Sequence, residues 1–477
     1  MPKPSDSSPS RTLARPASVE QPIKPLILLC DGTWCGREAN TKTNIYKLAQ
    51  LIGIEDPNDT DQDIIPGRVC YIHGVGLGST FLDYIFDGIT AQDIATQCIT
   101  AYKFIVWNYT YPDHEIWMFG LSRGAYLARS VAGMINNCGI IKPVRHSNGD
   151  IDEQATDMLC KQVYLIYRSP YRINKPHSPQ SKRFRRTKSW PLVGDENPDD
   201  PTAPRLTSPI KFMGLFDTVG SLGLPNFSGG VGLDWPAFYD QNISTAVENV
   251  YHAVSLHDRL YVFQPCLVSR NKEMHIGAWD KLGVTKQEWL PGMHYDLGRQ
   301  RFRFLREIGG GKLEKFLARW KFASKVIEPN KVLSNFALRW MLIAIREHNP
   351  PGHDQIIRDI DQHIARVTEK IRAPGRSPRR MGDGDVYGHI LDYAPFGSIF
   401  LNLYRAINGT RGRVSQLYQL FFALRDRLIP EDNANIYDFQ NIDVQISENE
   451  TLQELGDVNE RRYPSRAYQG WILRRNV

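Results

Sequence analysis

The sequence lacks a hydrophobic run of the ~18 to 20 residues that a helix needs to cross a bilayer. Residues 1–24 are rich in serine, proline and arginine, and they contain no apolar core of the kind that a secretory signal has. We expect 1–24 to form a disordered tail. These absences favour a cytoplasmic protein whose contact with membranes, if it makes one, is peripheral.

Cysteine is scarce as well. The chain has seven cysteines in 477 residues, an odd number scattered along the sequence, which favours reduced thiols over a disulfide framework. Cys30 and Cys35 are too far apart for a Cys-x-x-Cys redox pair, and no cluster of cysteine and histidine has the spacing of a zinc site. The glycine-rich segment 74–78 lacks the Lys-Ser/Thr pair of a P-loop. We therefore expect neither a metal nor a cofactor.

The net charge of +6 is modest, but basic residues are unevenly placed. The stretch 168–188 holds eight Lys or Arg residues and no acid, and 195–200 then holds four acids. Prolines and serines interrupt the basic run, which is typical of a disordered surface insertion, here at about 168–206. The alternative is a patch that attracts an anionic membrane surface. Nucleic-acid binding is not favoured, because no aromatic ladder or nucleic-acid module accompanies the basic residues.

Short apolar runs alternate with segments of helical periodicity over the first 300 residues. Hydrophobic residues make up 42% of the chain, as in ordinary globular proteins. The predicted strands are 25–30, 68–73, 115–119, 211–216, 251–255 and 287–290, and the predicted helices among them are 43–52, 89–108 and 125–138. Strands that alternate with helices predict an α/β fold with a doubly wound, mainly parallel sheet.

Beyond about residue 300 the pattern becomes mostly helical. Helical periodicity extends over 332–347, 355–372 and 414–428, and the segment 373–384 is expected to be a loop. We therefore divide the chain into an α/β domain over 25–300 and a helical C-terminal region over 301–477, packed on it as an extension or cap. The amphipathic helices suit a core or cap better than a membrane anchor.

The most informative motif is Gly-x-Ser-x-Gly at 120–124, between an apolar run and a helical segment. A strand that turns sharply into a helix holds a serine in a strained conformation with its hydroxyl exposed. Gly120 and Gly124 let neighbouring backbone approach that turn. Ser122 is therefore the predicted nucleophile. The alternative is a glycine-rich turn without chemistry.

A nucleophilic serine needs a base, and a third group that orients the base. Asp217 follows the strand at 211–216, so it should lie at the same sheet edge as Ser122, although it also suits a turn cap. His294 lies in a Pro-Gly loop after a short strand and is the predicted base, with Asp296 as the second choice of acid. Other histidines fit less well because they lie in a helix, beside a proline pair or in a segment that looks structural: His252, His257, His348, His353 and His363.

An oxyanion formed at the acyl carbon needs two N–H donors. The backbone of Arg123, the residue after the nucleophile, is one candidate. The other is the loop Asp31-Gly32-Thr33 after the first strand, where Gly32 permits an unusual backbone and Asp31 can lock the loop through hydrogen bonds. The glycines of 74–78 compete as a phosphate cradle, but a flexible rim of the site is the favoured role.

Taken together, the motifs resemble a family of α/β-hydrolases of formerly unknown function that includes the type VI secretion phospholipase effectors. Ordered matches run from about residue 25 to about residue 345. The residues that carry the resemblance are Leu29-Cys30-Asp31-Gly32-Thr33-Trp34, Thr43-Asn44-Ile45, Tyr71 with Gly74-Val75-Gly76, Phe119-Gly120-Leu121-Ser122-Arg123-Gly124-Ala125-Tyr126, Gly214-Leu215-Phe216-Asp217-Thr218-Val219-Gly220, Tyr251-His252-Ala253 and Pro291-Gly292-Met293-His294 with Asp296.

The resemblance implies an α/β-hydrolase fold, a Ser122, Asp217 and His294 triad, and hydrolysis of carboxylic esters, with phospholipase activity known for some relatives. The loop after His294 departs from the family, since Tyr295 replaces a small residue and Arg299-Gln300 replaces two glycines. From the resemblance we expect hydrolysis of carboxylic esters of lipids, such as the acyl esters of phospholipids. The alternatives are an esterase or thioesterase acting on a soluble metabolite, and a hydrolase-like scaffold without catalysis.

Overall fold

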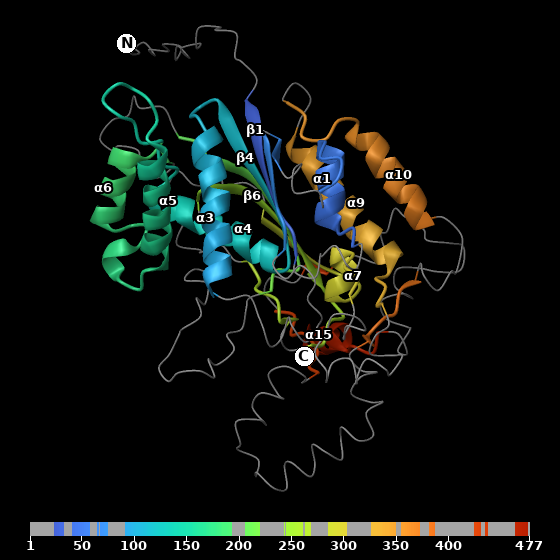
Figure 1. The fold of residues 1–477 in the computed structure, drawn as a ribbon. Coiled ribbons are helices and arrows are strands. Elements are labelled where there is room, and N and C mark those ends of the chain that lie inside the picture. The colour runs from blue at the N-terminus through green and yellow to red at the C-terminus, as the bar shows by residue number, and fades with distance from the viewer. Residues whose placement is uncertain are drawn as a thin grey trace, which may run out of the picture.

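The computed structural model (Figure 1) describes sixteen parts of the chain. They are residues 23–32, 41–57, 64–65, 67–74, 91–192, 206–219, 243, 245–260, 263–268, 285–302, 326–349, 354–372, 381–386, 424–430, 435–436 and 463–475. The predicted tail at 1–24 lies almost wholly outside them, as does most of the predicted helix at 414–428.

The fold is built on an eight-stranded sheet with the order β2-β3-β1-β4-β5-β6-β7-β8. All neighbouring pairs are parallel except β2 with β3. The strands are β1 (Lys24–Cys30), β2 (Ile64–Ile65), β3 (Val69–Ile72), β4 (His114–Leu121), β5 (Ile210–Phe216), β6 (Val247–Ser255), β7 (Thr285–Leu290) and β8 (Asn435–Ile436). The predicted α/β class with a mainly parallel sheet is confirmed.

Helices cover both faces of this sheet, and Figure 1 shows the two layers on either side of it. One layer contains α3 (Ala91–Asn108), α4 (Arg123–Cys138) and α5 (Glu153–Arg168). The other contains α1 (Asn44–Ile52), α9 (Lys331–His348) and α10 (Ile360–Arg372). Because both faces are buried, the strands are apolar throughout: in β1, Ile27 and Leu29 belong to the core under α1 and α9, and Leu26 and Leu28 to the core under α3 and α4.

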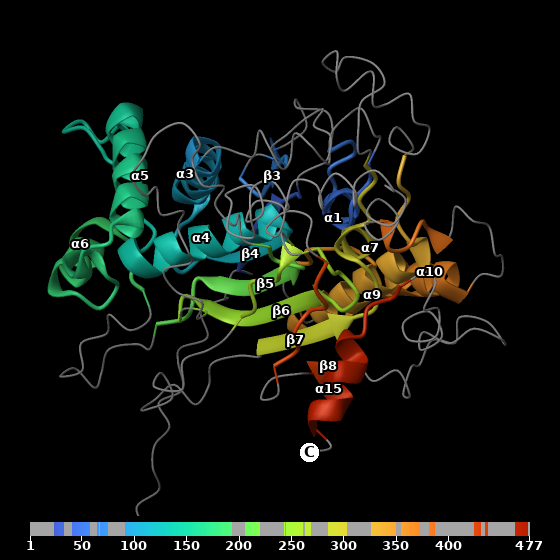
Figure 2. The same ribbon diagram turned by 90° about the horizontal axis from the view of Figure 1, so that it is seen from below.

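The order of the strands places a topological switch point between β1 and β4. After β1 the chain moves to β3 on one side, and after β3 it returns through α3 to β4 on the other side. In open α/β sheets, ligands bind outside the carboxyl ends of the strands at such a point. In Figure 2 the arrows of β5, β6 and β7 point toward α7 (His294–Gly298), which lies beside the ends of the strands.

Two sequence-based expectations need correction. The described part of the basic insertion is ordered: α5, a short turn of 3₁₀ helix η3 (Arg172–Asn174) and α6 (Pro179–Lys188) form a hairpin against α4. The buried guanidinium of Arg185 anchors it, because Nη1 donates to the carbonyls of Asn137 at 3.0 Å and Pro176 at 2.8 Å. Such backbone contacts leave no local pattern in the sequence.

The second correction concerns the end of the predicted helix at 414–428. Residues 424–428 are not helical, because Leu424 forms an antiparallel bridge with Leu260 and Arg427 turns inward to the carboxyl ends of the strands. Long-range contacts here override local helical periodicity. The C-terminal region also contributes β8 and α15 (Ala467–Arg475). The division of the chain at about residue 300 remains a prediction, and in the described residues no helix is long and apolar enough to span a membrane.

Candidate active site

Ser122 lies in a sharp turn between β4 and α4, with φ of 57° and ψ of −120°. A non-glycine residue rarely adopts a positive φ, and such strain persists only where the surrounding structure holds it. The Ser122 amide donates to the carbonyl of Phe216 at 2.9 Å, which ties the turn to the end of β5. A Cβ on Gly120 would lie 2.5 Å from the Cα of Ala125, and one on Gly124 would clash with the carbonyl oxygen of Cys30. Both glycines of the motif are therefore sterically required.

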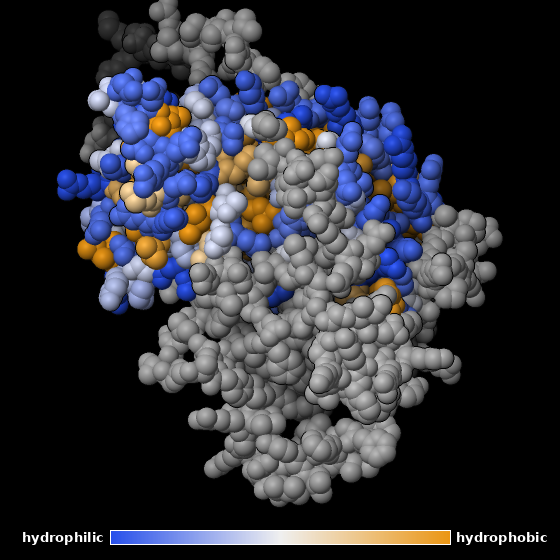
Figure 3. Space-filling view, viewed as in Figure 1, coloured by the Kyte–Doolittle hydropathy of each residue, from blue (hydrophilic) through white to orange (hydrophobic). Residues whose placement is uncertain are grey.

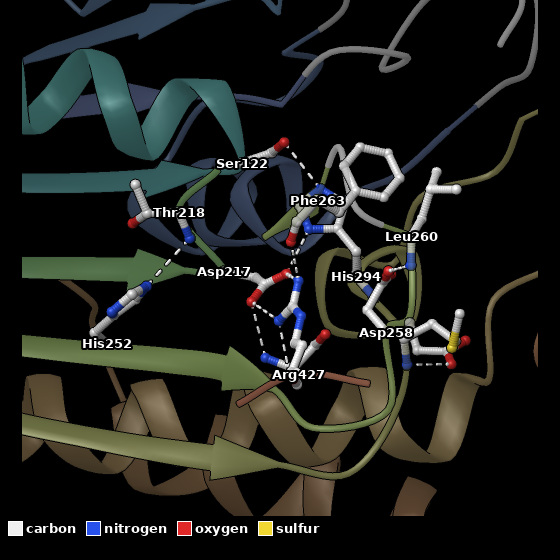
Figure 4. A network of polar contacts seen from close by, with 12 residues as sticks. Ser122, Asp217, Thr218, His252, Asp258, Leu260, Phe263, His294 and Arg427 are labelled. Atoms are coloured by element: carbon white, nitrogen blue, oxygen red, sulfur yellow. Dashed lines mark hydrogen bonds and ion pairs between the residues drawn. The ribbon is translucent and has the colours of Figure 1, made fainter. Parts of the chain in front are cut away.

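The structure brings Ser122, His294 and Asp217 together in that order (Figure 4). The Nε2 atom of His294 lies 2.9 Å from the hydroxyl oxygen of Ser122. Its Nδ1 lies 2.6 Å from Oδ2 of Asp217. The three residues come from the ends of β4, β5 and β7, and all three side chains are buried. This is the arrangement in which an imidazole can accept the serine proton while a carboxylate fixes its tautomer.

Several neighbouring groups hold the carboxylate of Asp217 in place. Its φ is +40°, and its Oδ1 accepts the backbone N–H of Ser255 at 2.9 Å. The guanidinium of Arg427 binds both carboxylate oxygens, with Nη1 2.6 Å from Oδ1 and Nη2 2.9 Å from Oδ2. Burial acts most strongly and raises the pKa of Asp217, but the charges and hydrogen bonds of Arg427 and His294 together outweigh it. The net pKa therefore lies well below the usual range, and Asp217 is ionised.

Arg427 was missed in the sequence. It lies in the segment expected to be helical and carries no motif, so only the tertiary structure reveals it. Its side chain is completely buried, and it also donates to the carbonyl oxygens of Ser255, at 2.7 Å, and Phe263.

The loop that carries His294 is held by two further buried carboxylates. Asp258 accepts the backbone N–H of His294 at 3.0 Å. Asp296 accepts the N–H of Met293 at 2.9 Å and that of Asn330 at 2.7 Å. Burial raises the pKa of both carboxyls to about 6. Asp296, the second choice of acid, thus binds loop backbone.

The loop after β1 also differs from the simplest expectation. The Gly32 N–H donates to Oδ1 of Asp31 at 2.7 Å, and Asp31 further accepts the hydroxyls of Thr43 and Tyr71. Asp31 locks the loop, as expected. Its carboxylate, however, also accepts the backbone N–H of Gly32, which was expected to bind the oxyanion. Thr33 lies outside the described residues, as do residues 75–78 of the glycine-rich segment. Arg123 is the first residue of α4, where backbone N–H groups have no acceptor within the helix.

Three residues singled out from the sequence have scaffold contacts. The Nε2 atom of His252 accepts the N–H of Thr218 at 3.1 Å, next to Asp217. The Nδ1 atom of His257 accepts the N–H of Gly292 at 2.9 Å. Tyr295, the departure from the family pattern beside His294, is buried and donates its hydroxyl to the carbonyl of Gly384.

Among the described residues, no group of three or more His, Cys, Asp or Glu side chains is arranged to hold a metal ion.

Comparison with known proteins gives one family and a few distant relatives. The catalytic domain of Tle1-like phospholipase effectors of the type VI secretion system matches residues 24–344. An uncharacterized protein of Saccharomyces cerevisiae is 27% identical over 264 residues, which cover 51% of this chain and 32% of that protein. The chain thus spans about a third of the length of this curated relative.

Two solved structures are also similar to the chain. The Tle1 effector bound to the VgrG spike from the Type 6 secretion system is 18% identical, with 58% of this chain and 51% of that chain covered and a TM-score of 0.25. An uncharacterized protein from Pseudomonas aeruginosa is 14% identical, with 84% and 64% covered and a TM-score of 0.27. The family match extends over more than half of the sequence and includes Ser122, Asp217 and His294, so the chain belongs to the family of Tle1-like phospholipase effector catalytic domains.

Proposed function

We propose that this protein hydrolyses carboxylic esters, and that its substrates are acyl esters of phospholipids. The observation that carries the proposal is the continuous chain of contacts from the Ser122 hydroxyl through His294 to the ionised Asp217. Membership of a phospholipase effector family supports the lipid substrate.

The proposed reaction has two half-reactions. The Ser122 oxygen attacks the acyl carbon while Nε2 of His294 accepts the hydroxyl proton, and His294 then returns this proton to the departing alcohol. Water, activated by the same imidazole, next cleaves the acyl-serine ester and releases the fatty acid. Asp217 accepts the Nδ1–H throughout and stabilises the imidazolium form.

The oxyanion of each tetrahedral intermediate needs donors that are already in place. The backbone N–H of Arg123, at the positive end of α4, is the first. The second belongs to the loop after β1, which lies against Gly124. Since Asp31 already accepts the Gly32 N–H, we assign this second role to Thr33, or to Gly32 after it leaves Asp31.

The α5–η3–α6 hairpin is proposed to hold the protein on an anionic membrane surface. Tyr171 and Ile173 are 71% and 57% exposed in its turn, and the basic side chains Arg172, Arg183 and Arg186 are also exposed. Figure 3 shows hydrophobic groups within a largely hydrophilic surface in this part of the molecule. A contact with a membrane interface combines apolar side chains, which insert among the lipids, with basic side chains, which attract anionic head groups.

The hairpin lies to one side of the candidate active site. Tyr167 and Arg168, at the end of α5, lie close to Tyr126 in the first turn of α4. The Arg185 guanidinium binds both the carbonyl of Pro176, just after η3, and the carbonyl of Asn137, near the C-terminal end of α4. The turn η3 therefore lies toward the end of α4 that is away from Ser122.

Two measurements test the function. A fluorophosphonate probe should label the wild-type protein and leave Ser122→Ala unlabelled, and a wild type that resists the probe would exclude the serine hydrolase. Fatty acid release from phosphatidylglycerol liposomes should then be compared with hydrolysis of p-nitrophenyl butyrate. Activity on the soluble ester alone would support the rival function, an esterase for soluble metabolites, and would overturn the phospholipid substrate.

A further inference from the structure

The acid of the candidate site is bound by an arginine from a distant part of the chain. Asp217 and Arg427 are 210 positions apart, and Arg427 lies beyond residue 344, where the family match ends. Both side chains have a relative exposure of 0%. Figure 4 shows the guanidinium directly below the carboxylate, on the side away from Ser122.

The Asp217 carboxylate receives four N–H···O contacts, two of which come from this guanidinium. Oδ1 of Asp217 receives Nη1 of Arg427 and the Ser255 N–H, and Oδ2 receives Nη2 and Nδ1–H of His294. Both carboxylate oxygens are thus fixed, and the carboxyl plane cannot rotate away from the imidazole. A bidentate arginine supplies this planar constraint, whereas a lysine ammonium supplies charge alone.

The electrostatic effect is equally direct. A fully buried carboxylate with too few partners becomes protonated rather than remain charged in an apolar interior. A protonated Asp217 could no longer stabilise an imidazolium at His294. Because a guanidinium keeps its charge at any pH at which proteins fold, Arg427 provides a permanent counter-charge.

Arg427 also organises the loop that follows β6. Its two remaining contacts reach the carbonyls of Ser255 and Phe263, on either side of Asp258. The Arg425 amide donates to the carbonyl of Arg259 at 2.7 Å, so the whole segment is bound to this loop. Asp258 and Phe263 each contact His294, which links the C-terminal segment to the base as well as the acid.

We propose that Arg427 is a positioning residue that keeps Asp217 ionised and oriented, so that the C-terminal segment completes a four-residue unit of Ser122, His294, Asp217 and Arg427. The inference rests on the proposed function of the first three residues. A purely structural ion pair would affect folding alone. The proposed role also predicts that Arg427 influences the pH range in which His294 acts as a base.

The pH dependence follows from the groups that face Asp217. These are His294 on α7, Arg427, Asp258 in the loop after β6, and His252 on β6. Removing Arg427 leaves burial as the main influence and raises the pKa of Asp217. The carboxylate is then lost at a higher pH on acidification, so the acidic limb of the kcat/KM profile moves upward.

The experiment uses the full-length protein and p-nitrophenyl butyrate between pH 5 and pH 9. In Arg427→Met we expect kcat at pH 7 to fall at least about tenfold and the acidic limb to move up by about one pH unit or more. Arg427→Lys should lose kcat while keeping the limb near its wild-type position. Arg259→Met is the matched control, because it breaks the Arg259–Asp385 ion pair on the same loop without touching Asp217.

The outcomes separate the possibilities. An unmoved acidic limb in Arg427→Met, with kcat lowered only in proportion to the folded fraction, would overturn the proposal. If Arg427→Met does not fold, Arg427→Lys decides: wild-type kcat in that variant would equally overturn the orienting role. The downfield proton NMR signal of Nδ1–H of His294, titrated with pH, tests the same idea without turnover. An inactive wild type would refute the proposed function and leave this titration as the test of Arg427.

Discussion

The ring of Phe263 lies face to face with the imidazole of His294, with centroids 4.5 Å apart and planes inclined by 13°. His294 must direct Nδ1 at Asp217 and Nε2 at Ser122 at the same time, so its ring plane has little freedom. Phe263 closes one face of that ring, and its own carbonyl accepts a hydrogen bond from Arg427. The stacked aromatic ring therefore helps to hold the imidazole of the proposed base.

Phe263→Leu should lower kcat about tenfold with little change in KM, because the imidazole gains rotational freedom while the binding surface is kept. Phe212→Leu is the control, since Phe212 is equally buried and stacks on Trp117 and Tyr251, away from His294. Both variants should lose about 1 kcal/mol or slightly more of unfolding free energy. Equal losses of kcat in the two, measured with a soluble ester, would show that Phe263 contributes packing only.

Gly124→Ala should abolish activity and strongly reduce the yield of folded protein. The added methyl group would collide with the backbone carbonyls of Cys30 and Asp31, which have nowhere to move inside the sheet. Gly133→Ala, on the same helix, is the control, because the atoms nearest to its methyl group would belong to the end of the Tyr167 side chain and not to backbone. That variant should stay active and can gain up to about 1 kcal/mol of helix stability. Thermal unfolding and probe labelling report both effects.

Reversing two charges on the hairpin, in Arg183→Glu with Arg186→Glu, should weaken binding to phosphatidylglycerol vesicles. Each basic residue contributes about 1 kcal/mol near an anionic surface, so the loss is about 30-fold or more. The control is Arg358→Glu with Arg366→Glu, at and before α10 on the other side of the sheet (Figure 1). Vesicle flotation measures binding, and p-nitrophenyl butyrate hydrolysis should be unchanged in both. Equal loss of binding in the two pairs would point to net charge rather than the hairpin.

The candidate residues Ser122, Asp217 and His294 could be singled out because each comes after a strand, at a position with a local signature. The carboxyl ends of parallel strands share one edge, so the pattern of strands also predicts their proximity. Arg427 has no comparable signal. Its proposed role depends on a contact that spans 210 positions, and helical periodicity over 414–428 suggested a helix there. The occupied N–H of Gly32 was equally hidden, since it depends on which way the Asp31 carboxylate turns.

The last prediction concerns acid stability and His252. This imidazole is completely buried, and burial, followed by the positive charge of Arg129, lowers its pKa from 6.5 to about 4. It is therefore neutral at pH 7, which allows Nε2 to accept the N–H of Thr218 while Nδ1–H donates to Gln287 at 2.9 Å. A second proton on the ring would place two donors against each other at Thr218, directly beside Asp217.

The sign of the effect follows from proton binding. Between pH 6.5 and pH 4 the unfolded chain carries the proton on His252 and the folded chain does not, so stability falls as the pH falls through this window. Over the whole window the free energy of unfolding falls by about 3 kcal/mol. His252→Gln keeps an acceptor for Thr218 but cannot titrate, so it should escape this part of the loss. Asp258 and Asp296 also titrate in this range, but they do so in both proteins. Their effects on stability therefore cancel when the unfolding free energy of His252→Gln is subtracted from that of the wild type at each pH. A difference that stays constant from pH 7 to pH 4.5 would mean that His252 is not held neutral.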